Sequence, residues 1–255
     1  MTHVVARDVV RTFGGVDALG PISLDIREGE FVSVVGPSGC GKSTLMEIIG
    51  GLQDPDAGSV AIGGTDLAGP RDETSIVFQD SATLPWRTVL DNVAFALEAK
   101  GVPRAARLEI ARERLATVGL TDFAAHYPTQ LSGGMRQRVA IARALTTDPD
   151  LILADEPFGA LDEQTRLLMS FELLRVVERL SCSVLFITHS IQEAVLLSNR
   201  VVVMSARPGR ILDDIPIDLP LPRGLDVLTT PVATEAVGRI WALIRREAQL
   251  AMGLT

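Results

Sequence analysis

The chain has 255 residues, of which 47% are hydrophobic and 22% are charged, so it holds enough apolar material for one large globular domain or two small ones. Its formal net charge of −8 argues against a general nucleic-acid binder, and we expect no nucleic-acid partner. The most apolar stretches are of strand length, far short of the ~20 residues that a membrane span needs. Cys40 and Cys182 have no metal-like spacing and are typical of a reducing compartment, so we expect a cytosolic protein unless a partner holds it at a membrane.

The N-terminal part of the chain predicts strands. Apolar residues alternate at Val4–Val10 and Ile22–Ile26, which indicates short antiparallel strands with breaks at Gly14-Gly15 and at Gly20-Pro21. The run Phe31–Val35 is apolar and rich in β-branched residues, so it predicts a further strand.

The most informative stretch lies between that strand and a predicted helix that contains Leu45–Ile49. It fits the phosphate-binding pattern G-x-x-x-x-G-K-[ST], and its residues are Gly36, Pro37, Ser38, Gly39, Cys40, Gly41, Lys42, Ser43 and Thr44. Glycines let the backbone wrap closely enough for its N–H groups to point at phosphate oxygens, and the following helix N-terminus favours negative charge. We therefore predict a nucleotide site in which Lys42 reaches the β- and γ-phosphates and the Ser43 hydroxyl ligates Mg²⁺.

Helical character replaces this pattern in the middle of the chain. Val60–Ile62 and Ile76–Phe78 predict two more strands, separated by a turn-rich region at residues 63–72. From about Val89 to Leu131 the spacing is helical, with one apolar face formed by Leu108, Ala111, Leu115 and Val118. We predict a helical subdomain at residues 87–131, inserted into a core that comprises residues 1–86 and 132–220.

Strands and helices then alternate. The predicted strands are Leu151–Ala154, Val184–Ile187 and Val201–Met204, and the predicted helices are Glu163–Leu180 and Ile191–Leu197. This alternation indicates a mostly parallel sheet. Residues 221–255 predict a C-terminal helical extension that packs on the body through one apolar stripe, formed by Ala233, Val237, Ile240, Trp241, Ile244 and Ala248.

Two carboxylates follow the buried strand that ends at Ala154. At the carboxyl end of a parallel strand they face the crevice where such sheets bind ligands. We predict that Asp155 holds Mg²⁺, directly or through water, and that Glu156 orients and polarises a water for in-line attack on the γ-phosphate.

A second loop suited to anions lies at Leu131–Gln137. Ser132 is followed by Gly133 and Gly134 and by a helix-like run, Arg136–Leu145, so this helix N-terminus also favours negative charge. The chain thus has two phosphate-seeking loops but only one complete nucleotide loop. We interpret Ser132 and Gly134 as residues that act on a nucleotide bound by a second copy.

In order and spacing, these motifs resemble the ATP-binding subunit of an ABC transporter over nearly the whole chain. The resemblance rests on the phosphate loop, on the signature Leu131-Ser132-Gly133-Gly134-Met135 and on the Asp155-Glu156 pair. It implies an α/β fold: a P-loop NTPase (RecA-like) core with a parallel sheet, an N-terminal antiparallel β subdomain and an inserted helical subdomain. It also implies an ATPase that uses ATP and Mg²⁺, and a homodimer in which each site joins one copy's phosphate loop to the other copy's signature.

Further roles are implied by the resemblance alone. Gln79 matches the residue that senses Mg²⁺ and touches the helical region, and His189 matches the one that contacts the γ-phosphate. Asp162 matches the acidic residue of the loop that links the two sites. Phe13 is the candidate for stacking on adenine, with Val16 as apolar support, because stacking works with any π-face.

Three segments, Leu84–Trp86, Val89–Val93 and Ser205–Ile211, resemble importers of nitrate, alkanesulfonates and taurine. That resemblance implies integral-membrane permease subunits as partners, a periplasmic or lipoprotein solute-binding protein as an indirect partner, and a peripheral location at the cytoplasmic face of the inner (cell) membrane. One alternative is the ATPase of an exporter or lipid transporter. Another is a DNA-maintenance ATPase, but such proteins usually insert a long coiled coil, and no sustained heptads lie between Thr44 and Leu131.

Overall fold

The computed structural model describes residues 4–220 and 223–251, and the chain divides into two units. The first unit combines Met1–Arg71 with Ser181–Thr255, and the second is Asp72–Leu180. The predicted helical subdomain, residues 87–131, lies within the second unit, and the predicted core is shared between the units. The subdomain boundaries drawn from the sequence therefore stay a prediction.

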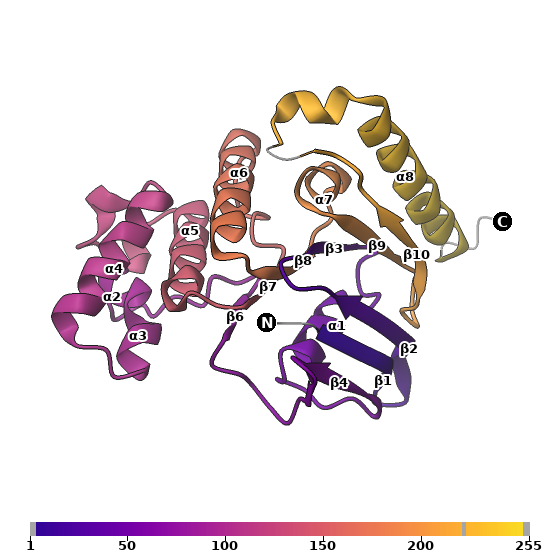
Figure 1. Cartoon of the computed structure of the whole chain (residues 1–255), viewed down its shortest axis with the longest axis horizontal. Coiled ribbons are helices and arrows are strands. Elements are labelled where there is room, and N and C mark those ends of the chain that lie inside the picture. Colours follow the sequence, from indigo (N-terminus) through magenta and orange to yellow (C-terminus); the bar gives the residue numbers. More distant parts are fainter. Residues whose placement is uncertain (1–3, 221–222, 252–255) are drawn as a thin grey trace. The chain divides into compact units, whose positions relative to one another are not determined.

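The first sheet of the first unit is antiparallel and includes the long strands β1 and β2 (Figure 1). β1 (Val4–Phe13) pairs with β2 (Val16–Ile26) on one side and with β4 (Ala57–Ile62) on the other, and both pairings are antiparallel. The N-terminal antiparallel sheet is confirmed, with strands longer than those predicted. A short strand, β5 (Thr65–Asp66), extends the sheet from within the region expected to be turn-rich.

The prediction that Gly20-Pro21 breaks the strand is wrong, because both residues lie within β2. The pairing register shifts at this point, since Val9 opposes Ile22 while Arg11 opposes Leu19. Such an irregularity accommodates a residue without an N–H group, and Pro21 is exposed there.

The second sheet of the first unit contains the strand that leads into the phosphate loop. β3 (Phe31–Val35) lies between β8 (Ser183–Ile187) and β9 (Arg200–Met204) and runs parallel to both. These strands are buried at nearly every position, as strands covered on both faces are. A strand that the sequence did not reveal, β10 (Ile211–Pro216), pairs antiparallel with β9.

The α-helices of the first unit are α1 (Lys42–Ile49), α7 (Ile191–Leu197) and α8 (Pro231–Ala251). The C-terminal helix α8 packs on the body through Ala233 and Ile240, which join a buried cluster with residues of α7 and β9 (Figure 1). Trp241 was predicted to belong to the packed stripe, but its side chain is turned outward and is 58% exposed. A 3₁₀ turn, Leu225–Thr229, precedes α8.

The second unit has two strands and a set of helices. β6 (Thr74–Val77) and β7 (Leu151–Asp155) pair in parallel. The helices are α2 (Val89–Val93), α3 (Phe95–Ala99), α4 (Arg104–Thr117), α5 (Gly133–Ala144) and α6 (Glu163–Leu180), with 3₁₀ turns at Thr121–Phe123, Pro128–Gln130 and Leu145–Thr147. Ala111 and Leu115 are buried on the predicted apolar face of α4.

One buried arginine ties the segment before α8 to the end of α7. Arg223 is 6% exposed, and its guanidinium donates hydrogen bonds to the carbonyl oxygens of Val195, Leu196, Ser198, Ile217 and Leu219. Carbonyl groups at a helix C-terminus have no partner within the helix, so Arg223 supplies donors that α7 would otherwise lack.

We predict that Arg223→Met lowers the free energy of unfolding by about 3 kcal/mol, because it leaves several buried carbonyl groups without a donor. Chemical denaturation measures this change. Arg239→Met is the matched control, since Arg239 also joins α8 to the body, through Asp213, but is 55% exposed. We expect the control to lose less than about 1 kcal/mol, and equal losses in the two variants would contradict the assignment.

Candidate nucleotide-binding and hydrolysis site

The phosphate loop joins β3 to α1 in the first unit. Gly39 (φ 72°) and Gly41 (φ 97°) both have left-handed backbone conformations, which side chains disfavour. A Cβ atom at Gly41 would overlap the Cδ2 atom of Leu19 on β2, so no side chain fits there. Residues in this arrangement turn successive N–H groups toward one side and form a concavity that binds anions.

Lys42 lies folded onto this loop. Its Nζ atom donates to the carbonyl oxygens of Gly36 and Pro37, at 2.9 Å each, and the residue is only 6% exposed. Charge-assisted bonds of this kind hold the ammonium group at the loop, within reach of the oxygens of a bound phosphate. Burial raises the pKa of the Cys40 thiol, and the neighbouring Lys42 offsets only part of that shift. Cys40 is therefore a neutral, buried thiol, which fits a small filler residue.

Helix α1 begins directly at the loop, at Lys42. Gly41 is the N-cap residue, and among the described residues no side chain caps this helix N-terminus. Ser43 is exposed in the first turn of the helix. This is the arrangement in which a helix N-terminus receives an anion.

The two residues predicted to face adenine flank the turn between β1 and β2. Phe13 and Val16 oppose each other in the pairing register and are 44% and 48% exposed. The guanidinium of Arg11 lies 4.9 Å from the centre of the Phe13 ring. The Phe13 side chain is therefore partly exposed and does not lie in the core.

His189 follows β8, the parallel neighbour of β3. The carboxyl ends of parallel strands meet at one edge of a sheet, so His189 and the phosphate loop leave the sheet at the same edge. Its neighbour Ser190 caps α7, because its Oγ atom accepts a hydrogen bond from the Glu193 N–H at 3.2 Å.

In the second unit, Asp155 ends β7 and is 7% exposed. Glu156 follows with φ 46°, a conformation that is strained for a residue with a side chain and that clusters at functional sites. The Nε2 atom of Gln79 lies 3.4 Å from the Oε2 atom of Glu156 and donates to it. The structure thus brings Gln79 and Glu156 together, although 77 positions separate them in the chain.

The signature begins α5 in the same unit. The Oγ atom of Ser132 accepts a hydrogen bond from the Met135 N–H at 3.2 Å and so caps the helix. A Cβ atom at Gly134 would lie 2.8 Å from the Cδ2 atom of Leu161, so the signature packs directly against the segment that contains Asp162. The Thr165 N–H donates to the Asp162 carboxylate and lowers the pKa of that group, which therefore stays ionised.

Two residues of α5 to which the sequence assigned no role bond to the backbone on either side of Gln79. Gln137 donates to the Phe78 carbonyl oxygen at 3.1 Å, and Arg143 donates to those of Ala82 and Ser81 at 2.9 and 3.1 Å. Burial lowers the pKa of Arg143. A side chain that bonds to a distant carbonyl group leaves no periodic signal, so the sequence revealed only a helix here.

The predicted site residues are distributed over both units. Lys42, Ser43 and His189 belong to the first, whereas Gln79 and the Asp155-Glu156 pair belong to the second, as do the signature residues Ser132, Gly133 and Gly134 and the acidic Asp162. The residues predicted to ligate Mg²⁺ fit that ion chemically, because a hydroxyl, an amide and a carboxylate all supply oxygen atoms.

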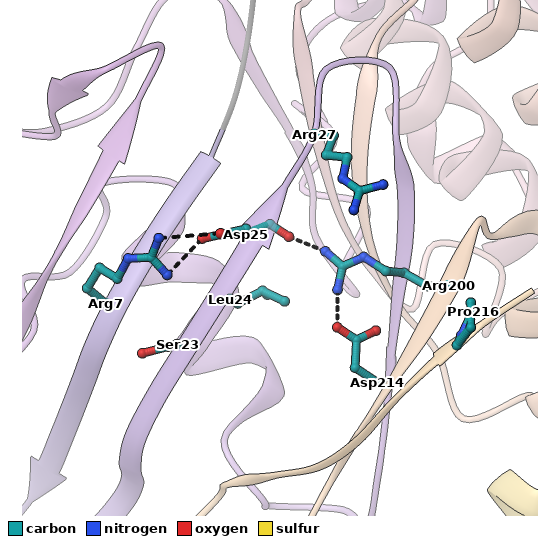
Figure 2. Close-up of a pocket in the computed structure, with 8 residues that line it drawn as sticks. All are labelled: Arg7, Ser23, Leu24, Asp25, Arg27, Arg200, Asp214 and Pro216. Carbon is teal, nitrogen blue, oxygen red and sulfur yellow. Dashed lines mark hydrogen bonds and ion pairs between the residues drawn. The ribbon is translucent and has the colours of Figure 1, made fainter.

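A polar hollow in the first unit lies away from the phosphate loop. Figure 2 shows Arg200 between Asp25 and Asp214, with Arg7 facing Asp25. The hollow has a volume of about 470 Å³. Arg200 opens β9 beside the start of β3, so this hollow is at the amino ends of the parallel strands, opposite to the end from which the phosphate loop leaves.

Comparison with known proteins settles the family. A family model described as ABC transporter matches residues 19–159, which include the phosphate loop, the signature and the Asp155-Glu156 pair. The chain belongs to the ABC transporter family. It is an ATP-binding, ATP-hydrolysing cassette of that family. None of its described helices is both long and apolar enough to cross a membrane.

Two curated relatives and one solved structure illustrate the similarity. The taurine import ATP-binding protein TauB of Chromobacterium violaceum is 52% identical over 195 residues, 76% of this chain and 75% of the relative. The nitrate import ATP-binding protein NrtD of Synechocystis is 46% identical over 222 residues, 86% of this chain and 84% of the relative. The solved structure is the ATP-binding cassette MJ0796, a dimer in a post-hydrolysis state bound to ADP and Pi. Its sequence is 35% identical to this chain, and the two structures match with a TM-score of 0.76 over 85% of this chain and 100% of that one. The predicted fold class is thereby confirmed.

We predict that Glu156→Gln lowers the rate of ATP hydrolysis at least about 100-fold, because the amide can no longer accept a proton from the attacking water. Nucleotide affinity should stay near the wild-type value, since the amide keeps the size of the carboxylate. Phosphate release and equilibrium binding measure the two quantities. Glu163→Gln is the control, an exposed carboxylate at the start of α6 that should change neither. Hydrolysis by Glu156→Gln at the wild-type rate would remove Glu156 from this role.

Proposed function

We propose that this chain is the ATP-hydrolysing motor subunit of an importer for nitrate, taurine, an alkanesulfonate or a related small solute. The supporting observation is the identity of 52% to a taurine import and 46% to a nitrate import ATP-binding protein, over most of the chain in each case. Both named solutes carry a small oxyanion group, so the proposal is limited to solutes of that chemistry.

Within one site, the proposed roles follow from chemistry and position. The phosphate loop, Gly36–Thr44, binds the phosphates through its N–H groups, and Lys42 binds the β- and γ-phosphates. Glu156 orients the attacking water, and His189 contacts the γ-phosphate. Phe13 stacks on adenine, with Val16 beside it; the exposure of both side chains supports this role.

We assign Mg²⁺ to Ser43, Gln79 and Asp155. Each supplies an oxygen ligand of the kind that Mg²⁺ prefers, directly or through water. When bound, the ion would neutralise charge that develops on the phosphate oxygens. The contact between Gln79 and Glu156 supports a link between metal binding and the residue that handles the water.

The proposed active form is a homodimer. Ser132, Gly133 and Gly134 of one copy would contact the γ-phosphate held by the other copy, and Asp162 would link the two sites. The dimer described for the similar cassette supports this arrangement. ATP drives closure only if it binds the closed state more tightly than the open one, and the signature contacts supply that difference.

The proposed partners are integral-membrane permease subunits and, indirectly, a periplasmic or lipoprotein solute-binding protein. Trp86 supports a docking role for the segment after Gln79, because this large apolar side chain is 71% exposed. The chain would then sit at the cytoplasmic face of the inner membrane as a peripheral subunit, held there by the permease.

A site shared by two copies predicts that two inactive variants complement each other. Lys42→Ala lacks a working phosphate loop and Ser132→Arg lacks a working signature, so neither should hydrolyse ATP alone. A mixed dimer joins the intact Lys42 of one variant to the intact Ser132 of the other. At equal concentrations we expect up to about a quarter of the wild-type rate, since half of the dimers are mixed and each has one intact site.

Substantial hydrolysis by Ser132→Arg alone, or no recovery on mixing, would contradict the shared site. Thr88→Arg is the matched control for Ser132→Arg, because Thr88 caps α2 in the same way, through a bond from the Asp91 N–H. That variant should hydrolyse ATP like the wild type, which would show that loss of a helix cap does not explain the inactivity of Ser132→Arg.

The importer assignment predicts solute-stimulated ATP turnover. The chain, purified with its native permease subunits and reconstituted in liposomes with the solute-binding protein, should hydrolyse ATP faster when nitrate, taurine or an alkanesulfonate is present on the binding-protein side. Chloride is the control that matches nitrate in charge, and alanine is the control that matches taurine in size. Stimulation by none of the oxyanion solutes, or movement of lipid instead, would contradict the proposal.

A further inference from the structure

The loop between β9 and β10, Ser205–Arg210, lies against the phosphate loop within the first unit. Its own hydrogen bonds close it. The Ser205 N–H donates to the Arg210 carbonyl oxygen at 2.9 Å, and the Arg210 N–H donates to the Ser205 Oγ atom at 3.0 Å. The Ser205 hydroxyl also bonds to the carbonyl oxygen of Pro208 at 3.0 Å. We call this segment the β9–β10 loop.

Arg207 makes the first contact with the phosphate loop. Its Nη2 and Nε atoms donate to the Gly39 carbonyl oxygen at 3.1 and 3.3 Å. That carbonyl group and the Cys40 N–H belong to one planar peptide group and point in opposite directions. By holding the carbonyl oxygen, Arg207 therefore fixes the direction of the Cys40 N–H, one of the groups that a phosphate loop offers to an anion.

Gly209 makes the second contact, with the next peptide group. A Cβ atom at this position would overlap the Cys40 carbonyl oxygen, so the Gly209 backbone lies directly against that oxygen. Gly209 is itself fixed by β2, because its N–H donates to the Ala18 carbonyl oxygen at 3.0 Å and its carbonyl oxygen accepts from the Gly20 N–H at 2.9 Å. Two successive peptide groups of the phosphate loop are thus held from outside.

The C-terminal helix holds the β9–β10 loop in turn. The Oε2 atom of Glu247 on α8 accepts a hydrogen bond from the Ala206 N–H at 2.9 Å. Ala206 immediately precedes Arg207, so this bond orients the residue that contacts Gly39. A continuous series of contacts therefore runs from α8 through the β9–β10 loop to the phosphate loop.

We propose that Arg207 is a positioning residue of the nucleotide site and that α8 acts on that site through Glu247. This inference rests on the proposed function, since it takes residues 36–44 to bind the phosphates of ATP. A loop whose N–H groups are held in place before ATP arrives pays less ordering entropy on binding. Arg207 touches the loop from outside and has no part in the chemical step.

The test is ATP affinity against turnover in the full chain. We expect Arg207→Ala to bind ATP about tenfold more weakly, as the loss of a charged hydrogen-bond donor to the Gly39 carbonyl oxygen implies. It should raise KM and leave kcat near the wild-type value. Arg207→Lys, which keeps the charge and a donor, should recover part of the affinity. Added guanidinium ion at millimolar concentration should do the same for Arg207→Ala, because the site is exposed.

Arg210→Ala is the matched control from the same loop. The Arg210 side chain lies against Gly20 of β2 and makes no described hydrogen bond to the phosphate loop, so this variant should bind ATP like the wild type. Wild-type ATP affinity in Arg207→Ala, or an equal loss in Arg210→Ala, would overturn the inference. Failure of the wild-type chain itself to bind ATP would instead overturn the proposed function.

The role of α8 has its own test. Glu247→Ala should weaken ATP binding, whereas Glu247→Gln, which keeps an acceptor for the Ala206 N–H, should not. Because Glu247 acts through Arg207, the double variant Arg207→Ala/Glu247→Ala should bind ATP no more weakly than Arg207→Ala alone. Additive losses, or wild-type affinity in Glu247→Ala, would overturn the part assigned to the helix.

Discussion

The structure of the first unit depends on the close approach of other backbone segments to the phosphate loop. Gly41 leaves no room for a side chain beside Leu19, and a Cβ atom at Gly36 would lie 2.8 Å from the Met204 carbonyl oxygen. The loop therefore lies in close contact with both β2 and the end of β9. Strand β3 and helix α1 supply its two ends, and Lys42 bonds back onto it.

The second unit is organised around the other half of the chemistry. Its signature helix α5 bonds through Gln137 and Arg143 to the backbone on either side of Gln79, while Gln79 itself contacts Glu156. The same helix packs through Gly134 against the segment that contains Asp162. One unit thus contains both the signature, which would contact the γ-phosphate of ATP bound by a second copy, and the residues that would bind water and metal. In the proposed dimer, closure on ATP could therefore affect the residues that carry out hydrolysis through contacts within this unit.

Much of this architecture could be predicted from the sequence, because buried strands and capped helices leave local patterns. The bounds of α6 and α7 agree with prediction, and β3, β7, β8 and β9 agree within one residue. Prediction failed where tertiary contacts decide. β10 carries Asp213 and Asp214 and so lacks an apolar pattern, Gly20-Pro21 is accommodated by a register shift, and the partners of Arg207 and Arg143 lie far away in the chain. The roles of the site residues, inferred from motif order, remain predictions.

In the proposed cycle, the terminal phosphate of ATP joins two copies of this chain, and its removal lets them part. The most direct measurement is the mass in solution of the Glu156→Gln protein, by sedimentation or light scattering, with Mg-ATP and with Mg-ADP at equal saturation. We expect a dimer with ATP and single chains with ADP. Single chains under both conditions, even when the permease subunits are present, would contradict it.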